Sequence, residues 1–162
     1  PIKAAEMKGA FAILKKHYTA PQSLAQAKHK YAYDYFLSYS RADESLARVL
    51  FEELRAINPE VRIFYDRQEL DNGAAWQQEI YDALDNCNKV IVLLSPTYLL
   101  SKVCNEEYNI ARLRHRESGR DVLIPLYVAS APLPSHMKVM QFTDCRERDI
   151  DKLKQIARAM LT

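Results

Sequence analysis

The sequence predicts a flavodoxin-like α/β fold, in which a five-stranded parallel sheet carries helices on both faces. Strand-like and helix-like segments alternate from about residue 33 to the end of the chain, as they do in doubly wound sheets. Residues 89–94 contain a continuous apolar run, which is typical of a central parallel strand covered on both faces. The segments between the strands are long enough to cross over the sheet and return in parallel.

Four elements are expected in the first half of this fold. Asp43 is a candidate N-cap for the first helix, and Asn58 and Pro59 end that helix. Aromatic and β-branched residues indicate the strands. The expected elements are a strand at 35–39, a helix at 47–54, a strand at 61–65 and, after the polar loop 66–75, a helix that begins at Trp76.

Five more elements are expected in the second half. Ser95 and Pro96 stop the central strand. The expected elements are a strand at 89–94, a helix at 105–114, a strand at 121–128, a short edge strand at 140–143 and a closing helix at 149–161. In such a sheet, ligands bind at the carboxyl ends of the strands, so the helix at 105–114 should open onto the site.

The charge distribution divides the chain into two parts, residues 1–30 and residues 31–162. The first part carries six Lys and one Glu, and the net charge of +2 for the whole chain leaves −3 for the second. We expect a basic helical extension followed by one α/β domain. No apolar run approaches the roughly 20 residues of a membrane-spanning helix, and so small a net charge does not suggest nucleic acid as a partner.

The sequence excludes several nucleotide and metal sites. Three glycines are too few and too dispersed for the glycine-rich motifs of Rossmann and P-loop proteins. The third strand ends in Ser95 and Pro96 rather than in the aspartate of a phosphate-receiver domain. The four histidines lack metal-binding spacing, so no metal is expected. Three widely spaced cysteines argue against a disulfide scaffold and favour a reducing, cytoplasmic location.

Around the first strand the sequence resembles Toll/interleukin receptor (TIR) domains. Residues 33–40, YDYFLSYS, followed by Asp43, are similar to the first sequence box of that family. The resemblance runs from residue 33 to about residue 161. It continues in DRQELDNG at 66–73, in VLLSPTYLLS at 92–101 and in CNEE at 104–107.

Resemblance to the NAD⁺-cleaving branch of the TIR family implies that Glu107 is the catalytic carboxylate. In that branch a Ser-x-Trp-Cys-x-x-Glu motif opens the third helix, and here Ser101, Cys104 and Glu107 match it. The neighbouring Glu106 lies about 100° away around the helix and is expected to face solvent.

The resemblance departs at one position of this motif. Val103 stands where the motif has Trp, which removes the aromatic ring that would stack on the substrate. Trp76 is a candidate replacement, and anchoring of its own helix to the core is an equally good account of it.

The resemblance implies that NAD⁺ is a substrate, so no separate cofactor is expected. Nicotinamide in NAD⁺ is a cationic substituent that leaves as a neutral molecule, so its departure needs no general acid. One ionised carboxylate can stabilise the growing oxocarbenium charge at the ribose carbon. The expected products are nicotinamide and either ADP-ribose or a cyclic isomer of it.

Candidate substrate contacts are the residues that the topology and the motif bring to the carboxyl edge. The guanidinium of Arg41 suits a diphosphate, although an ion pair with Asp43 or Glu44 is the alternative. Phe64 could offer its face to a ring. The candidates are Ser38, Tyr39, Ser40, Arg41, Phe64, Asp66, Trp76 and Cys104.

TIR domains also act as adaptors that bind other TIR domains without catalysis. The loop after the second strand carries this contact in the family, so Glu69, Asp71 and Gly73 are candidate interface residues. The charge of this loop favours a reversible contact, and we expect head-to-tail association into a homo-oligomer or filament. Assembly would then control catalysis, with immune or anti-phage defence as the implied role.

Overall fold

The computed structural model describes residues 30–65 and 74–161. The predicted basic helix in the first 29 residues therefore lies outside the described residues. Within them, five parallel strands form one sheet in the order β2-β1-β3-β4-β5, so the predicted doubly wound sheet is confirmed. The strands are β1 (Tyr33–Ser38), β2 (Ile63–Phe64), β3 (Cys87–Leu94), β4 (Leu123–Tyr127) and β5 (Thr143–Asp144).

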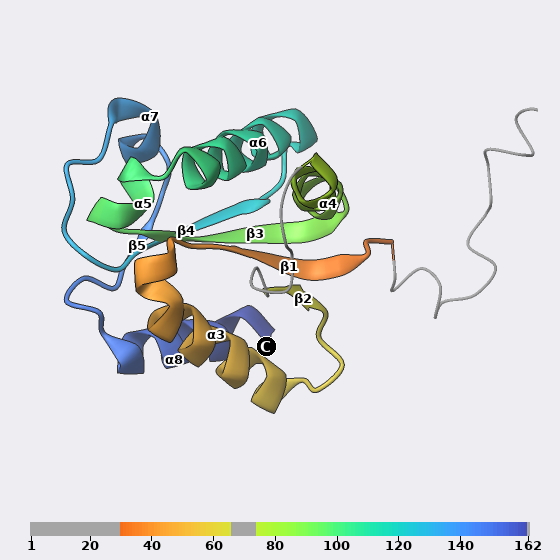
Figure 1. Cartoon of the computed structure of the whole chain (residues 1–162). Helices are drawn as coiled ribbons and strands as arrows, with labels where there is room; N and C mark the ends of the chain where they lie inside the picture. The colour runs from red at the N-terminus through yellow and green to blue at the C-terminus, as the bar shows by residue number, and fades with distance from the viewer. Residues whose placement is uncertain (1–29, 66–73, 162) are drawn as a thin grey trace, which may run out of the picture. The chain divides into compact units, whose positions relative to one another are not determined.

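Helices cover both faces of the sheet, as Figure 1 shows. On the upper face lie α4 (Ala74–Asp85), α5 (Pro96–Leu100), α6 (Lys102–Ser118) and α7 (Ser135–Lys138). On the lower face lie α3 (Glu44–Ile57) and α8 (Ile150–Leu161), and a short 3-10 turn, η1 (Arg41–Asp43), leads from β1 into α3. No described helix has both the length and the apolar character that crossing a bilayer requires.

The alternation of side chains along β1 assigns its residues to two separate cores. Tyr35 and Leu37 point to the lower core, which α3 and α8 complete, whereas Phe36 belongs to the upper core under α4 and α6. Because neighbours on a strand point to opposite faces, Ser38 follows Phe36 onto the upper face. Tyr39 packs in the lower core. The strand thus delivers a buried hydroxyl to the layer that contains α6.

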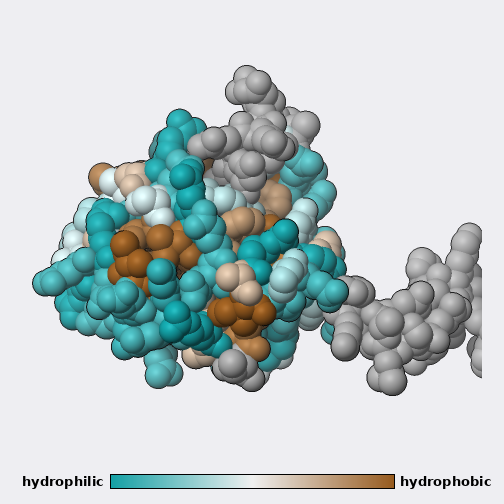
Figure 2. All heavy atoms as spheres, turned by 90° about the horizontal axis from the view of Figure 1, so that it is seen from below, coloured by the Kyte–Doolittle hydropathy of each residue, from teal (hydrophilic) through white to brown (hydrophobic). Residues whose placement is uncertain are grey.

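The lower face is built from two amphipathic helices. Leu46, Leu50 and Leu54 of α3 are fully or almost fully buried, as is Leu153 of α8. Seen from below, hydrophilic side chains cover most of this face, and hydrophobic atoms gather in two places (Figure 2). The apolar stripes of α3 and α8 therefore face the sheet, as in other surface helices.

Several predicted boundaries differ from the observed ones. The predicted helix at 105–114 is longer, because Ser101 caps its first turn and Gly119, with φ of 65°, ends it in the left-handed conformation. The edge strand begins three residues later than predicted, and β2 has two residues instead of five. The short helices α5 and α7 were not predicted.

Candidate functional site

The side chain of Glu107 lies on the second turn of α6, where the helix opens at the carboxyl edge of the sheet. The N-cap hydroxyl of Ser101 accepts a hydrogen bond from the Cys104 amide at 3.2 Å and fixes this first turn. Glu107 is 1% exposed, whereas its neighbour Glu106 is exposed, as the helical spacing predicts. The two adjacent glutamates therefore occupy different environments.

Glu107 belongs to a buried hydrogen-bond network that joins α6 to β1. Ser38 Oγ donates to Glu107 Oε1 at 3.1 Å and lies 2.7 Å from the Tyr98 hydroxyl. That hydroxyl in turn donates to the carbonyl oxygen of Cys104 at 2.9 Å. Tyr98 comes from α5, so three elements fix the position of this one carboxylate.

Two adjoining hollows lie beside the N-terminal half of α6. The first, of about 250 Å³, is lined by Tyr39, Ser40, Arg41, Glu44, Trp76, Ile80, Ser101, Val103 and Cys104. The second, of about 460 Å³, is lined by Trp76, Gln77, Ile80, Tyr81, Val103, Glu106 and Glu107. Because Trp76, Ile80 and Val103 line both, the hollows form one cleft with a shared wall. The second hollow has the volume of a small-molecule site, and the first extends it.

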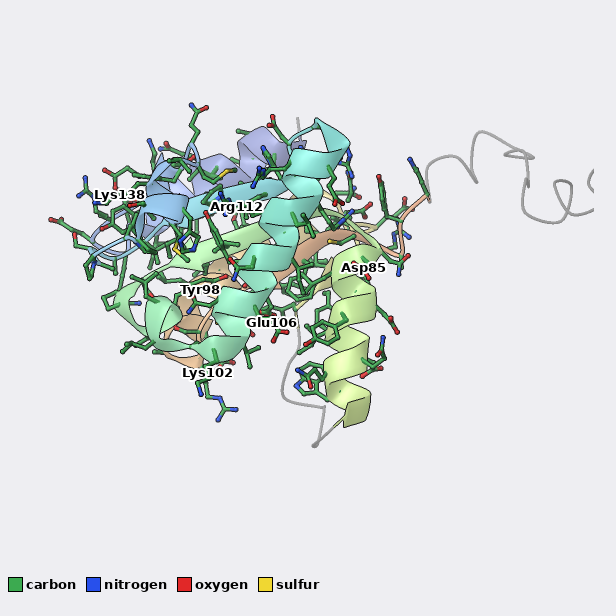
Figure 3. All side chains as sticks on the ribbon, turned by 90° about the horizontal axis from the view of Figure 1, so that it is seen from above. Asp85, Tyr98, Lys102, Glu106, Arg112 and Lys138 are labelled. Atoms are coloured by element: carbon green, nitrogen blue, oxygen red, sulfur yellow. The ribbon has the colours of Figure 1, made fainter. Side chains whose placement is uncertain are left out.

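A hydrogen bond between α4 and α6 spans the rim of the second hollow. Figure 3 shows the two helices side by side, with Glu106 between them. The Tyr81 hydroxyl donates to Glu106 Oε1, and this bond raises the pKa of Tyr81. The charged groups that line the cleft are Arg41 and Glu44 in the first hollow and two glutamates in the second.

The aromatic residues predicted at the cleft have different surroundings. Trp76 is partly exposed in the shared wall. Its indole stacks on Phe64, with ring centroids 6.1 Å apart, and Phe64 stacks in turn on Phe36 at 4.9 Å. Phe64 lines neither hollow and packs behind Trp76 against the upper core. Trp76 thus both anchors its helix to the core and lines the cleft.

The described candidate residues otherwise gather at this edge. Ser40, Arg41 and Cys104 line the first hollow with Tyr39, whose ring packs against Tyr65 on the other side of the sheet. Asp43 forms an ion pair with Arg148, and Glu44 forms one with Arg48. The ion pair of Arg41 with one of these acids, the alternative to a diphosphate contact, is therefore not observed among the residues that the structure describes. The candidates Asp66, Glu69, Asp71 and Gly73 lie outside the described residues.

The prediction that Asp43 is the N-cap of the first helix is confirmed in position, but its side chain does not perform the capping. The fully buried carboxylate accepts instead from Ser40 Oγ at 2.9 Å, from Ser95 Oγ and from the Arg148 guanidinium. These donors lie at the ends of β1 and β3 and before α8, and no local sequence pattern reveals that they meet.

Sequence reasoning missed other residues of the cleft. Ile80 lies one turn beyond Trp76 on α4 and Tyr81 lies one turn beyond Gln77, and this helical spacing was available as a signal. Tyr98 was missed because α5 was not predicted. No cluster of three or more metal-binding side chains occurs in residues 30–65 and 74–161.

Comparisons with known proteins identify the family to which this fold and cleft belong. The sequence pattern of TIR domains matches residues 36–158. The chain belongs to the TIR domain family. A solved TIR domain from the Toll-related receptor TRR-2 of Hydra magnipapillata superposes with a TM-score of 0.61 at 20% identity, over 81% of this chain and 100% of that one. This likeness supports the fold.

Curated relatives of this TIR domain include proteins named as enzymes and as receptors. The 2′ cyclic ADP-D-ribose synthase BtTIR of Bacteroides thetaiotaomicron is 33% identical over 97 residues, 59% of this chain and 32% of that protein. The NAD(+) hydrolase TcpC of Escherichia coli is 27% identical, over 72% of this chain and 38% of that protein. Toll-like receptor 2 of Bison bison is 24% identical, over 75% of this chain and 15% of that protein. The chain spans less than half of each relative.

Proposed function

We propose that this TIR domain cleaves the bond between nicotinamide and ribose in NAD⁺, with Glu107 as the catalytic carboxylate. The observation that carries the proposal is the position of Glu107, which is buried, held by Ser38 and at the lining of a cleft of small-molecule size. The names of two relatives, a cyclic ADP-D-ribose synthase and an NAD(+) hydrolase, support the same chemistry.

One carboxylate is sufficient for this reaction. The electron pair of the broken bond stays with the nicotinamide nitrogen and neutralises its positive charge, so the leaving group needs no proton. The developing positive charge on the ribose is the species that requires stabilisation, and a fixed carboxylate supplies it best where water is excluded. Burial of Glu107 and its bond to Ser38 provide such a fixed, poorly hydrated group.

The rest of the cleft offers contacts for the other parts of a dinucleotide. Arg41 is exposed in the first hollow, where its guanidinium can bind diphosphate oxygens. The indole of Trp76, in the shared wall, can contact a base or the nicotinamide ring. We propose that NAD⁺ spans both hollows, with its ribose beside Glu107.

We also propose that self-association, through the segment that contains Glu69, Asp71 and Gly73, raises the activity in a cytoplasmic defence pathway. Activity per molecule should then increase with protein concentration. The product is ADP-ribose or a cyclic isomer, depending on which group captures the ribosyl cation. An assay that separates the products of NAD⁺ cleavage distinguishes the two.

Nicotinamide release from NAD⁺ by the domain, at several protein concentrations and with the products separated by chromatography, tests the proposal. We expect Glu107→Gln to lower the rate by at least about a hundredfold, the order typical of a lost electrostatic contact to the transition state. Glu106→Gln should retain far more activity than Glu107→Gln. Glu117→Gln, an exposed acid near the end of the same helix, is the control that should match the wild type.

The alternative is a TIR domain that acts only by binding other TIR domains. The similarity to Toll-like receptor 2 and the presence of Val103 in place of the motif's Trp favour it. If the wild type releases no nicotinamide at any concentration, even when it is concentrated into assemblies, catalysis is wrong and this alternative stands.

A further inference from the structure

We propose that Arg148 is a positioning residue for substrate binding, which acts through Asp43 on the segment that contains Ser40 and Arg41. This inference rests on the proposed function, because that segment lines the first hollow. Arg148 lies in the loop before α8, 105 positions away from Asp43 in the sequence, and lines neither hollow.

The two oxygens of the Asp43 carboxylate have separate partners. The Arg148 guanidinium donates to Oδ1. Oδ2 accepts from Ser40 Oγ at 2.9 Å and from Ser95 Oγ. Ser40 Oγ also lies 2.6 Å from the Thr97 hydroxyl. With its side chain 46% exposed, Arg148 brings a charge from the surface to a carboxylate with no exposure, and thereby orients the oxygen that holds Ser40.

The backbone of Arg148 is fixed and strained. Its amide donates to the Val128 carbonyl oxygen at 3.0 Å, which attaches the loop to the end of β4. Glu147 and Arg148 have φ of 65° and 53°, and they are the two non-glycine residues with positive φ in the described part of the chain. This conformation costs on the order of 1 kcal/mol or more per residue, and glycine would avoid that cost. At Arg148 the contact of the guanidinium with Asp43 offsets part of this cost.

The route from Asp43 to the cleft is short. Ser40, Arg41 and Asp43 belong to one tight turn, closed by a hydrogen bond of 2.9 Å from the Asp43 amide to the Ser40 carbonyl oxygen. Arg41 is exposed, and its carbonyl oxygen accepts a hydrogen bond from the Glu44 amide, so its position depends on the turn that the Asp43 carboxylate anchors. A loosened Asp43 lets the turn shift, and a shift of about 1 Å is enough to weaken a directed contact strongly.

The first test uses NAD⁺ binding without turnover, measured by calorimetry on a Glu107→Ala background. We expect Arg41→Ala and Arg148→Ala each to weaken binding by about tenfold, the value of one charge-assisted hydrogen bond. The double variant should bind no more than about twofold more weakly than Arg41→Ala alone, because a misplaced Arg41 contributes little. Arg148→Lys should restore part of the affinity.

Arg146→Ala is the matched control, because Arg146 lies in the same loop but pairs with Asp144. It should change NAD⁺ affinity by less than about twofold. If Arg148 is purely structural, Arg148→Ala lowers the melting temperature and leaves the NAD⁺ affinity unchanged. If Arg148 acts independently of Arg41, the losses of affinity in the two single variants multiply in the double variant. Either result overturns the proposal.

A second measurement does not depend on NAD⁺. Arg148→Ala should speed hydrogen exchange of the amides at residues 40–44, whereas exchange in α6 and in the Arg146→Ala protein should match the wild type. If the wild type neither binds nor cleaves NAD⁺, the proposed function fails while this measurement still decides whether Arg148 positions the turn. Unchanged exchange at residues 40–44 overturns the positioning role.

Discussion

At the scale of single residues, Ser38 connects the sheet to the proposed chemistry. Its hydroxyl is fully buried and donates to Glu107, so it selects one orientation of the carboxylate. We predict that Ser38→Ala lowers kcat for nicotinamide release about tenfold or more, because a hydrogen bond to a charged group contributes about 1.5–3 kcal/mol. KM should change little. Steady-state kinetics beside Ser45→Ala, an exposed serine of α3, measures this, and an unchanged kcat contradicts the role.

The residue scale is also where sequence reasoning reached its limit. The sequence motif identified Glu107 as the candidate carboxylate, and the helical spacing distinguished it from Glu106. The contact with Ser38, however, depends on the face of β1 on which that serine lies. The N-cap position of Asp43 followed from a local rule, but the partners of its carboxylate are donors that only the fold brings together. The pairing with Arg148 joins residues 105 positions apart, and such a contact has no signature in one sequence.

At the scale of elements, the end of α6 gives a clear test. Gly119 has φ of 65°, and a Cβ added there would meet nothing within 4 Å, so backbone conformation alone determines the effect of substitution. We predict that Gly119→Ala destabilises the domain by about 1 kcal/mol and that Gly119→Asn costs less, because Asn tolerates the left-handed region. Urea unfolding of the three proteins measures the difference. Equal stabilities of the Ala and Asn variants would contradict this account.

Long, periodic elements were predictable, whereas short ones were missed or predicted with wrong bounds. The central strand and the helices α3, α6 and α8 have apolar patterns that extend over several turns or a full strand. The five-residue α5 and the four-residue α7 are too short for a helical period, and the two-residue β5 is defined by its pairing with β4. Such elements depend on tertiary contacts, which a single sequence does not contain.

At the scale of the whole molecule, the two faces of the sheet have different tasks. The second hollow, beside Glu107, lies between α4 and α6 in the upper layer, whereas α3 packs with α8 below the sheet. Leu153 of α8 is fully buried in the lower core. We predict that Leu153→Ala lowers the free energy of unfolding by about 2–5 kcal/mol through lost burial and a cavity. Chemical denaturation beside the exposed Gln155→Ala checks this, and a loss below 1 kcal/mol would contradict it.

Trp76 is the only tryptophan in the chain, and it lies in the wall shared by both hollows. Its fluorescence therefore comes from one place in the molecule, next to the cleft. A ring or a charge that enters either hollow changes the surroundings of the indole directly. The unlabelled protein thus carries its own optical reporter, with which occupancy of the cleft can be titrated whether or not any bond is broken.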